Sequence, residues 1–106
     1  MNDKQEIENH VRDLMKIHNL HDWNFRWLKN NQKFWRAGQC SYSKKEIALA
    51  PRFVELNEFL VVQNTILHEI AHALMPKHNH NKFWKRKFIE IGGNGKRCYD
   101  NSVRTS

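Results

Sequence analysis

The run His68-Glu69-Ile70-Ala71-His72 constrains this chain more than any other feature of its sequence. The apolar residues around it recur with the period of a helix from Leu60 to Leu74, and Pro76 follows shortly after. We therefore predict a helix that Asn57 caps and Pro76 stops. Four residues advance a helix by slightly more than one turn, so both histidine rings project from one face about 6 Å apart and can share one metal ion.

The residue types in this run suit a catalytic zinc site. Histidine is a common zinc ligand, and a catalytic zinc lowers the pKa of a bound water toward 7. Glu69 lies one step round the helix, where its carboxylate cannot easily join the ligands but can reach that water as a general base. We expect one Zn²⁺ ion, with His68 and His72 among its ligands and Glu69 as the catalytic residue.

A catalytic zinc needs a third protein ligand, and three residues compete for that position. His78 follows His72 by six residues, as in one class of zinc enzymes, but that class has a tightly turning Gly where this chain has Met75. His80 follows His72 by eight residues and directly precedes the last predicted helix. Glu90 lies eighteen residues after His72 in that helix, as in enzymes whose third ligand is on a second helix. The spacing alone does not choose among the three.

The rest of the sequence predicts a single α+β domain over residues 1–106, with a loosely held tail after about residue 99. Apolar residues at helical spacing indicate a helix near each end, and alternation of period two indicates strands between them. Turn-like segments separate the strands, so we expect a three-stranded antiparallel sheet. The expected elements are a helix over 3–18, strands over 23–27, 34–42 with Gly38 as a bulge, and 46–50, the metal helix, and a final helix from about 82 to Gly92-Gly93.

The chain is basic, with a net charge of +7, which favours anionic partners. Basic residues cluster around and after the last predicted helix, where they are candidates for contact with the phosphates of DNA. A solvated helix face explains the same pattern equally well. The residues of this cluster include Lys82, Lys85, Arg86, Lys87, Lys96 and Arg97.

The sequence shows no signal for export or for insertion into a membrane. Its N-terminus lacks a basic region followed by an apolar stretch, and the apolar stretch 59–75 is interrupted by polar residues and histidines. The two cysteines, Cys40 and Cys98, are expected to be thiols packed in or near the core. We therefore expect a cytoplasmic protein without membrane contact. The sequence predicts no oligomeric state.

From Phe34 to about Tyr99 the chain resembles the SprT-like family of zinc metalloproteases. The similar segments are residues 40–50, 54–57, 65–74, 78–84 and 91–98. A histidine four residues before the aromatic residue that opens the last helix is typical of the family. The resemblance implies that His80 is the third zinc ligand and that Trp84 is this aromatic residue. Asn81 stands where the family often has Gly, and Asn also suits turns and helix caps.

The resemblance implies a small zincin-like domain that hydrolyses peptide bonds in proteins, including proteins associated with DNA. We expect the sheet edge beside the metal to bind a protein or peptide substrate as an added strand. Tyr42 and Tyr99 are both candidates to stabilise the oxyanion, and the sequence does not select one. Many family members continue into a Cys-rich zinc ribbon, but this chain has the lone Cys98 there, so we expect no second zinc site. The alternative is a zinc-stabilised nucleic-acid-binding or adaptor protein with little or no proteolytic activity.

Overall fold

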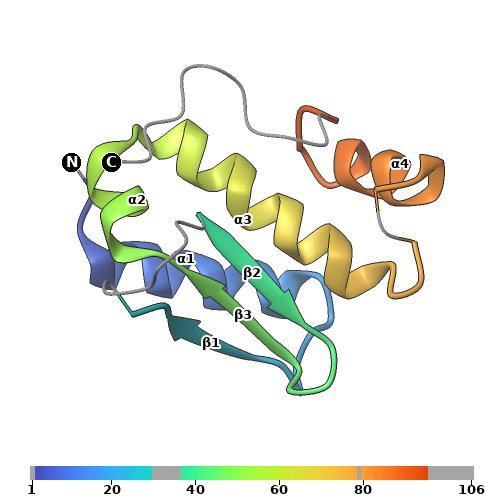
Figure 1. Ribbon diagram of the computed structural model, residues 1–106, viewed down its shortest axis with the longest axis horizontal. Helices are drawn as coiled ribbons and strands as arrows, with labels where there is room; N and C mark the ends of the chain where they lie inside the picture. Colours follow the sequence, from blue (N-terminus) through green and yellow to red (C-terminus); the bar gives the residue numbers. More distant parts are fainter. Residues whose placement is uncertain (1, 30–36, 79, 96–106) are drawn as a thin grey trace.

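The structure, a computed structural model, describes residues 2–29, 37–78 and 80–95 (Figure 1). The N-terminal helix confirms the helix predicted over 3–18. The Asp3 side chain caps this helix by accepting a hydrogen bond from the Gln5 N–H at 2.8 Å. Ile7 and Val11 of this helix are buried. In chain order, the elements within these ranges are α1 (Lys4–Ile17), β1 (Asn24–Trp27), β2 (Gly38–Ser41), β3 (Glu46–Leu49), α2 (Pro51–Leu56), α3 (Phe59–Leu74) and α4 (Lys82–Glu90).

The three strands form a mixed sheet, so the prediction of an antiparallel sheet was wrong. β3 lies in the centre, where it pairs antiparallel with β2 and parallel with β1. Composition explains this order. Ile47, Ala48 and Leu49 give β3 an unbroken apolar run, which is typical of a strand buried on both faces. β1 and β2 alternate with polar residues such as Arg26 and Gln39, and they take the edges.

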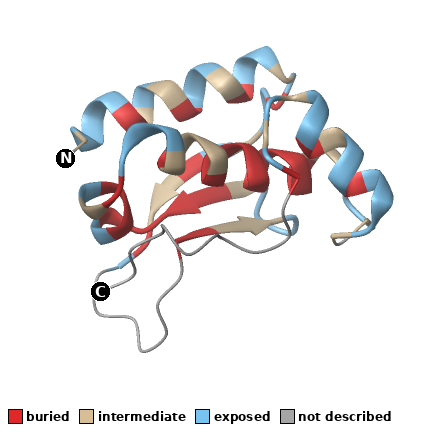
Figure 2. Ribbon diagram, turned by 90° about the horizontal axis from the view of Figure 1, so that it is seen from above, coloured by how far each residue is buried: buried red, intermediate tan, exposed pale blue. Residues whose placement is uncertain are grey.

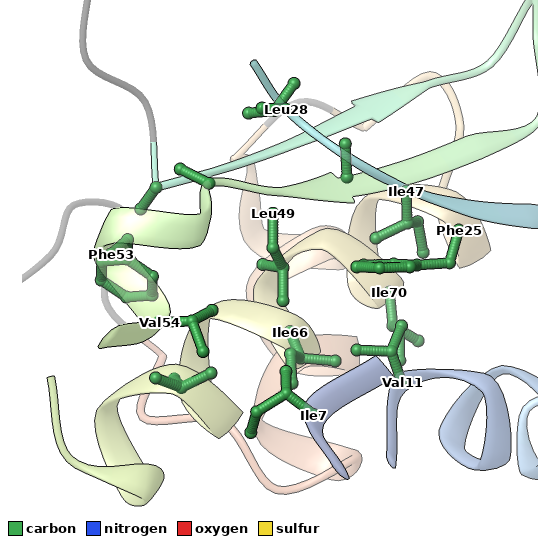
Figure 3. Close-up of a cluster of buried hydrophobic side chains, with 14 of the residues drawn as sticks. Ile7, Val11, Phe25, Leu28, Ile47, Leu49, Phe53, Val54, Ile66 and Ile70 are labelled. Carbon is green, nitrogen blue, oxygen red and sulfur yellow. The ribbon is translucent and has the colours of Figure 1, made fainter. Parts of the chain in front are cut away.

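Helices α1 and α3 lie on one face of the sheet, with α1 against β1 and α3 mainly against β2 (Figures 1 and 2). The main core fills the space between the sheet and these helices. Figure 3 shows Ile47 and Leu49 of β3 directed toward Ile66 and Ile70 of α3, with Val11 of α1 beside them. Because these five side chains are removed from water, their burial fixes α3 against the sheet.

Helix α4 packs against a second face of α3. Leu67 and Ala71 of α3 form a smaller buried cluster with Trp84 and Phe88 of α4. α3 is therefore enclosed on two sides, and its central turns are buried almost throughout (Figure 2). The helix predicted to hold the metal is thus the most enclosed helix that the structure describes.

The beginning of α3 differs from the prediction. Glu58 occupies the N-cap position without a side-chain hydrogen bond, and Asn57 belongs to the end of α2, where its Nδ2 donates to the Phe53 carbonyl at 2.9 Å. Asn57 is therefore not the cap of the metal helix. α2 itself was not predicted, although Pro51 at its first position is a known signal for a helix start.

The ranges of the remaining predicted elements agree with the structure to within one or two residues where it describes them. β3 and α4 match their expected ranges closely, and α4 ends just before Gly92. The N-terminal part of the predicted second strand (34–36), Lys96, Arg97, Cys98, Tyr99 and the tail lie outside the described residues. Within the ranges that are described, no helix has both the length and the apolarity needed to cross a membrane.

Candidate metal centre

Three histidines bring their Nε2 atoms together at one point. The Nε2 atoms of His68 and His72 lie 3.2 Å apart, those of His72 and His80 lie 3.0 Å apart, and those of His80 and His68 lie 3.2 Å apart. His68 and His72 come from consecutive turns of α3, and His80 comes from the loop before α4. Among the described residues these three form the one group with the geometry of a metal site.

The three nitrogens fit a zinc ion. A tetrahedral zinc with Zn–N bonds of about 2.05 Å separates its ligand nitrogens by about 3.3 Å, close to the observed separations. In a neutral imidazole the Nε2 atom is either a donor or an acceptor. Among three mutually adjacent Nε2 atoms at least two are therefore of the same kind and cannot hydrogen-bond to each other. A shared cation bound by their lone pairs removes that conflict. The donor set is therefore suited to zinc.

The loop that carries His80 uses unusual backbone geometry. His80 has a φ of 57°, in the left-handed region that non-glycine residues seldom adopt. Residues with such strained conformations occur often at functional sites. Asn81 follows with a φ of −85°, which any residue can adopt, and its side chain caps α4 by accepting from the N–H groups of Phe83 and Trp84. The departure from Gly at position 81 therefore supplies a helix cap, and the left-handed backbone lies one residue earlier, at His80.

Trp84 packs against all three histidine rings. Its ring stacks on His72 at a centroid distance of 5.2 Å and an interplanar angle of 26°, and meets His68 and His80 edge to face at 4.9 and 4.7 Å. Phe88 contacts His68 from one helical turn further on. Trp84 and Phe88 are fully buried. These rings limit the orientations that the imidazoles can adopt, which favours metal binding through preorganisation.

Burial keeps the histidines of α3 neutral. Desolvation, followed by the charges of the neighbouring His72 and His80, lowers the pKa of His68 to about 3. Desolvation and His80 lower the pKa of His72 to about 4. Only a neutral imidazole has the lone pair that a metal needs, so both side chains are ready to bind one at neutral pH.

Glu69 is 5% exposed and lies against β2, at a place where that strand has no side chain. A Cβ added to Gly38 would lie 3.3 Å from both Cγ and Oε2 of Glu69, and 3.3 Å from the Ala48 carbonyl oxygen. Gly38 was predicted to be a bulge, but it pairs in register with Leu49. The missing side chain at Gly38 leaves space for the Glu69 carboxylate, a contact that the sequence did not predict.

Two other side chains of β2 and the turn after it face the same region. Cys40 is a half-buried free thiol, and burial together with the Glu69 carboxylate raises its pKa to about 12. It is packed against the main core, as predicted. The Tyr42 hydroxyl donates a hydrogen bond to the His72 carbonyl oxygen at 2.7 Å, and burial is the main cause of its raised pKa.

The other candidates for the third ligand lie apart from the three converging nitrogens. The Nδ1 of His78 accepts a hydrogen bond from the Asn81 side chain at 3.0 Å, and its ring contacts Phe83. Glu90 is exposed and pairs with Lys87 at 3.1 Å. Neither belongs to the group of residues that could hold a metal.

The fold and the site define a class of protein: a small α+β domain whose central buried helix carries a His-Glu-x-x-His run and meets a third histidine from the following loop. The sequence model of the SprT-like family matches residues 5–104, nearly the whole chain. This chain belongs to the SprT-like family. No match was found among curated proteins.

Proposed function

We propose that this protein is a zinc-dependent metalloendopeptidase of the SprT-like type. The observation that carries the proposal is the convergence of three histidine Nε2 atoms, each 3.0–3.2 Å from the others, where two of the histidines lie on the helix that also carries Glu69. Three histidines leave a fourth position open in a tetrahedral site, as in catalytic rather than structural zinc sites. The matched family is a second, independent support.

Each residue of the centre has a defined role in this proposal. His68, His72 and His80 hold the ion, and Trp84 keeps their rings oriented. Zinc, when bound, polarises a carbonyl and makes a water molecule more acidic. The Glu69 carboxylate takes a proton from the attacking water and passes it to the leaving amine nitrogen. Its burial beside Gly38 keeps the carboxylate in one place for both transfers.

The substrate class that suits this centre is an extended segment of protein. β2 is an edge strand among the described strands, and it packs against α3. An extended peptide can bind to such an edge through main-chain hydrogen bonds without a specificity pocket. Gly38 and Cys40 of this strand lie near Glu69, so the edge runs past the proposed general base.

Contact with DNA is a further part of the proposal. Lys82, Lys85 and Arg86 are exposed on α4, close in sequence to His80. Lys87 is less available for contact with DNA phosphates, because it is partly buried and paired with Glu90. Exposed cations along one helix attract a phosphate backbone, with an affinity that falls steeply with salt. They would bring the centre to proteins bound on DNA.

The experiment that tests the proposal is cleavage of casein, an unfolded protein, by the zinc-loaded chain with and without single-stranded DNA. The Glu69→Gln variant should lose activity roughly 1000-fold while binding one zinc and melting at the same temperature. Glu58→Gln, the same change at an exposed glutamate that begins the same helix, serves as the matched control and should retain activity. Stoichiometric zinc without cleavage in any condition would favour the rival, a zinc-stabilised nucleic-acid-binding or adaptor protein.

A further inference from the structure

The last turn of α3 contains a carbonyl group that the helix itself cannot satisfy. In an α-helix, each carbonyl accepts from the N–H four residues further on, which for His72 is residue 76. Residue 76 is proline, which has no N–H. The preceding carbonyl, of Ala71, does receive its bond from Met75 N–H at 3.0 Å. His72 is only 9% exposed, so its carbonyl needs a donor from elsewhere in the fold.

Tyr42 supplies that donor from a part of the chain thirty residues away. Its hydroxyl lies 2.7 Å from the His72 carbonyl oxygen. Tyr42 begins the turn between β2 and β3, which Lys45 N–H closes onto the Tyr42 carbonyl at 3.3 Å. The Trp23 ring meets the Tyr42 ring edge to face at 6.3 Å. The hydroxyl is therefore held toward α3 by the turn and by an aromatic neighbour.

The hydrogen bond from Tyr42 to the His72 carbonyl holds a turn of α3 that belongs to the metal centre. His72 is the one proposed ligand that lies in the last turn of α3, and the loop leading to His80 starts three residues later. The His72 Nε2 is also within 3.2 Å of the Nε2 atoms of both other histidines. A donor fixed to the His72 backbone therefore limits the movement of that turn relative to the sheet.

We propose that Tyr42 is a positioning residue of the metal centre, whose hydroxyl replaces the N–H that Pro76 lacks and ties the last turn of the metal helix to the β2–β3 turn. This inference rests on the proposed role of the three histidines. A phenol has one hydrogen to donate, and here it is given to His72. Tyr42 therefore acts through His72 and does not stabilise an oxyanion in this arrangement.

The test is zinc affinity, measured by competition with a chelating dye, for the wild type and Tyr42→Phe. Partners that orient a metal ligand typically contribute 10–100-fold to affinity, and we expect a loss of about tenfold. The d–d spectrum of the cobalt-loaded variant should shift, because the geometry of its ligands changes. Ser43→Ala removes a hydroxyl from the same turn, one that lies beside the Ser41 hydroxyl at 3.5 Å, and it should change neither quantity.

A second background separates this role from general stabilisation. Pro76→Ala restores an N–H four residues after His72, so Tyr42→Phe should lose less than about threefold in zinc affinity there if the two donors substitute for each other. Equal losses in both backgrounds would overturn the inference. The inference would also be overturned if Tyr42→Phe kept the zinc affinity and cobalt spectrum of the wild type and lowered only kcat. That result is expected if the Tyr42 hydroxyl stabilises an oxyanion. A wild-type chain that binds no zinc would overturn the proposed function and this inference with it.

Discussion

At the scale of single residues, the centre depends on a few side chains and on the absence of a side chain at Gly38. Each proposed ligand has its ring oriented by Trp84, and the proposed base fills the space above Gly38. The two sets of contacts come from different elements, α4 and β2. Metal binding and proton transfer should therefore be separable by mutation.

The third ligand can be tested by comparing two histidines of the same loop. His80→Ala removes one of three converging nitrogens and should weaken zinc binding more than about 100-fold, a larger loss than that of a residue that only orients a ligand. His78→Ala is the matched control, because His78 contacts Asn81 and Phe83 instead, and its zinc affinity should stay within about twofold of the wild type. Isothermal titration calorimetry measures both. A larger loss in His78→Ala than in His80→Ala would reverse the assignment.

Gly38→Ala should impair the chemical step and leave the metal in place. The added methyl would lie 3.3 Å from Glu69 Cγ and Oε2 and from the Ala48 carbonyl, so the carboxylate must move by a few tenths of an ångström. Misplacement of a catalytic group by about 1 Å can cost 100-fold, and we expect kcat to fall about tenfold with zinc affinity unchanged. Steady-state kinetics with a fluorescent peptide would show it. Unchanged kcat would mean that Gly38 has no part in positioning Glu69.

At the scale of elements, α4 begins two residues after the proposed third ligand, His80. Asn81 accepts hydrogen bonds at 3.0 and 3.1 Å from two N–H groups of the first turn of α4, and His80 immediately before it has a strained backbone. Asn81→Ala should lower stability by about 1 kcal/mol, or about 5 °C in the melting temperature of the metal-free protein. Asn81→Asp keeps the cap and should melt near the wild type. Differential scanning calorimetry distinguishes them, and equal melting of all three proteins would show that the cap contributes nothing.

The elements themselves were largely predictable where a local pattern decides them. The periods of α1, α3 and α4 and the spacing of His68 and His72 are local properties of the sequence. The position of β3 between β1 and β2 is not, because strand order depends on which strand is buried on both faces. The run Ile47-Ala48-Leu49-Ala50 carried that information, but the turn-like segments between the strands favoured an antiparallel sheet, whereas β1 and β3 are parallel.

The site was predictable in part for the same reason. Local spacing placed His68, Glu69 and His72 on one helix, but it did not separate His80, His78 and Glu90. His80, which the family resemblance implied, is the one that the path of the loop brings to the other two histidines. The contacts of Gly38 with Glu69 and of Tyr42 with His72 join residues about thirty positions apart, and no local pattern reports them. The proline four residues after His72 was the one available signal for Tyr42, since it leaves a carbonyl without its helical donor.

At the scale of the whole molecule, zinc should stabilise the fold substantially. The proposed ligands lie on α3 and on the loop before α4, so a bound ion links these two segments. A ligand at 100 times its Kd adds about 2.7 kcal/mol, which corresponds to about 10–20 °C in melting temperature for a domain of this size. Removing zinc with EDTA should reverse the shift, and His80→Ala should show little of it. Equal shifts in wild type and His80→Ala would place the stabilising zinc elsewhere.

The most direct test of the central claim is zinc X-ray absorption spectroscopy on the zinc-loaded protein, with the metal content measured on the same sample. We predict one zinc per chain with three imidazole ligands and one oxygen from solvent, all at about 2.0–2.1 Å, the coordination of a catalytic site. A sulfur at about 2.3 Å, or a fourth imidazole, would mean a closed site that leaves no position for water. That result would contradict the account, because a closed site stabilises a fold without the chemistry proposed for Glu69.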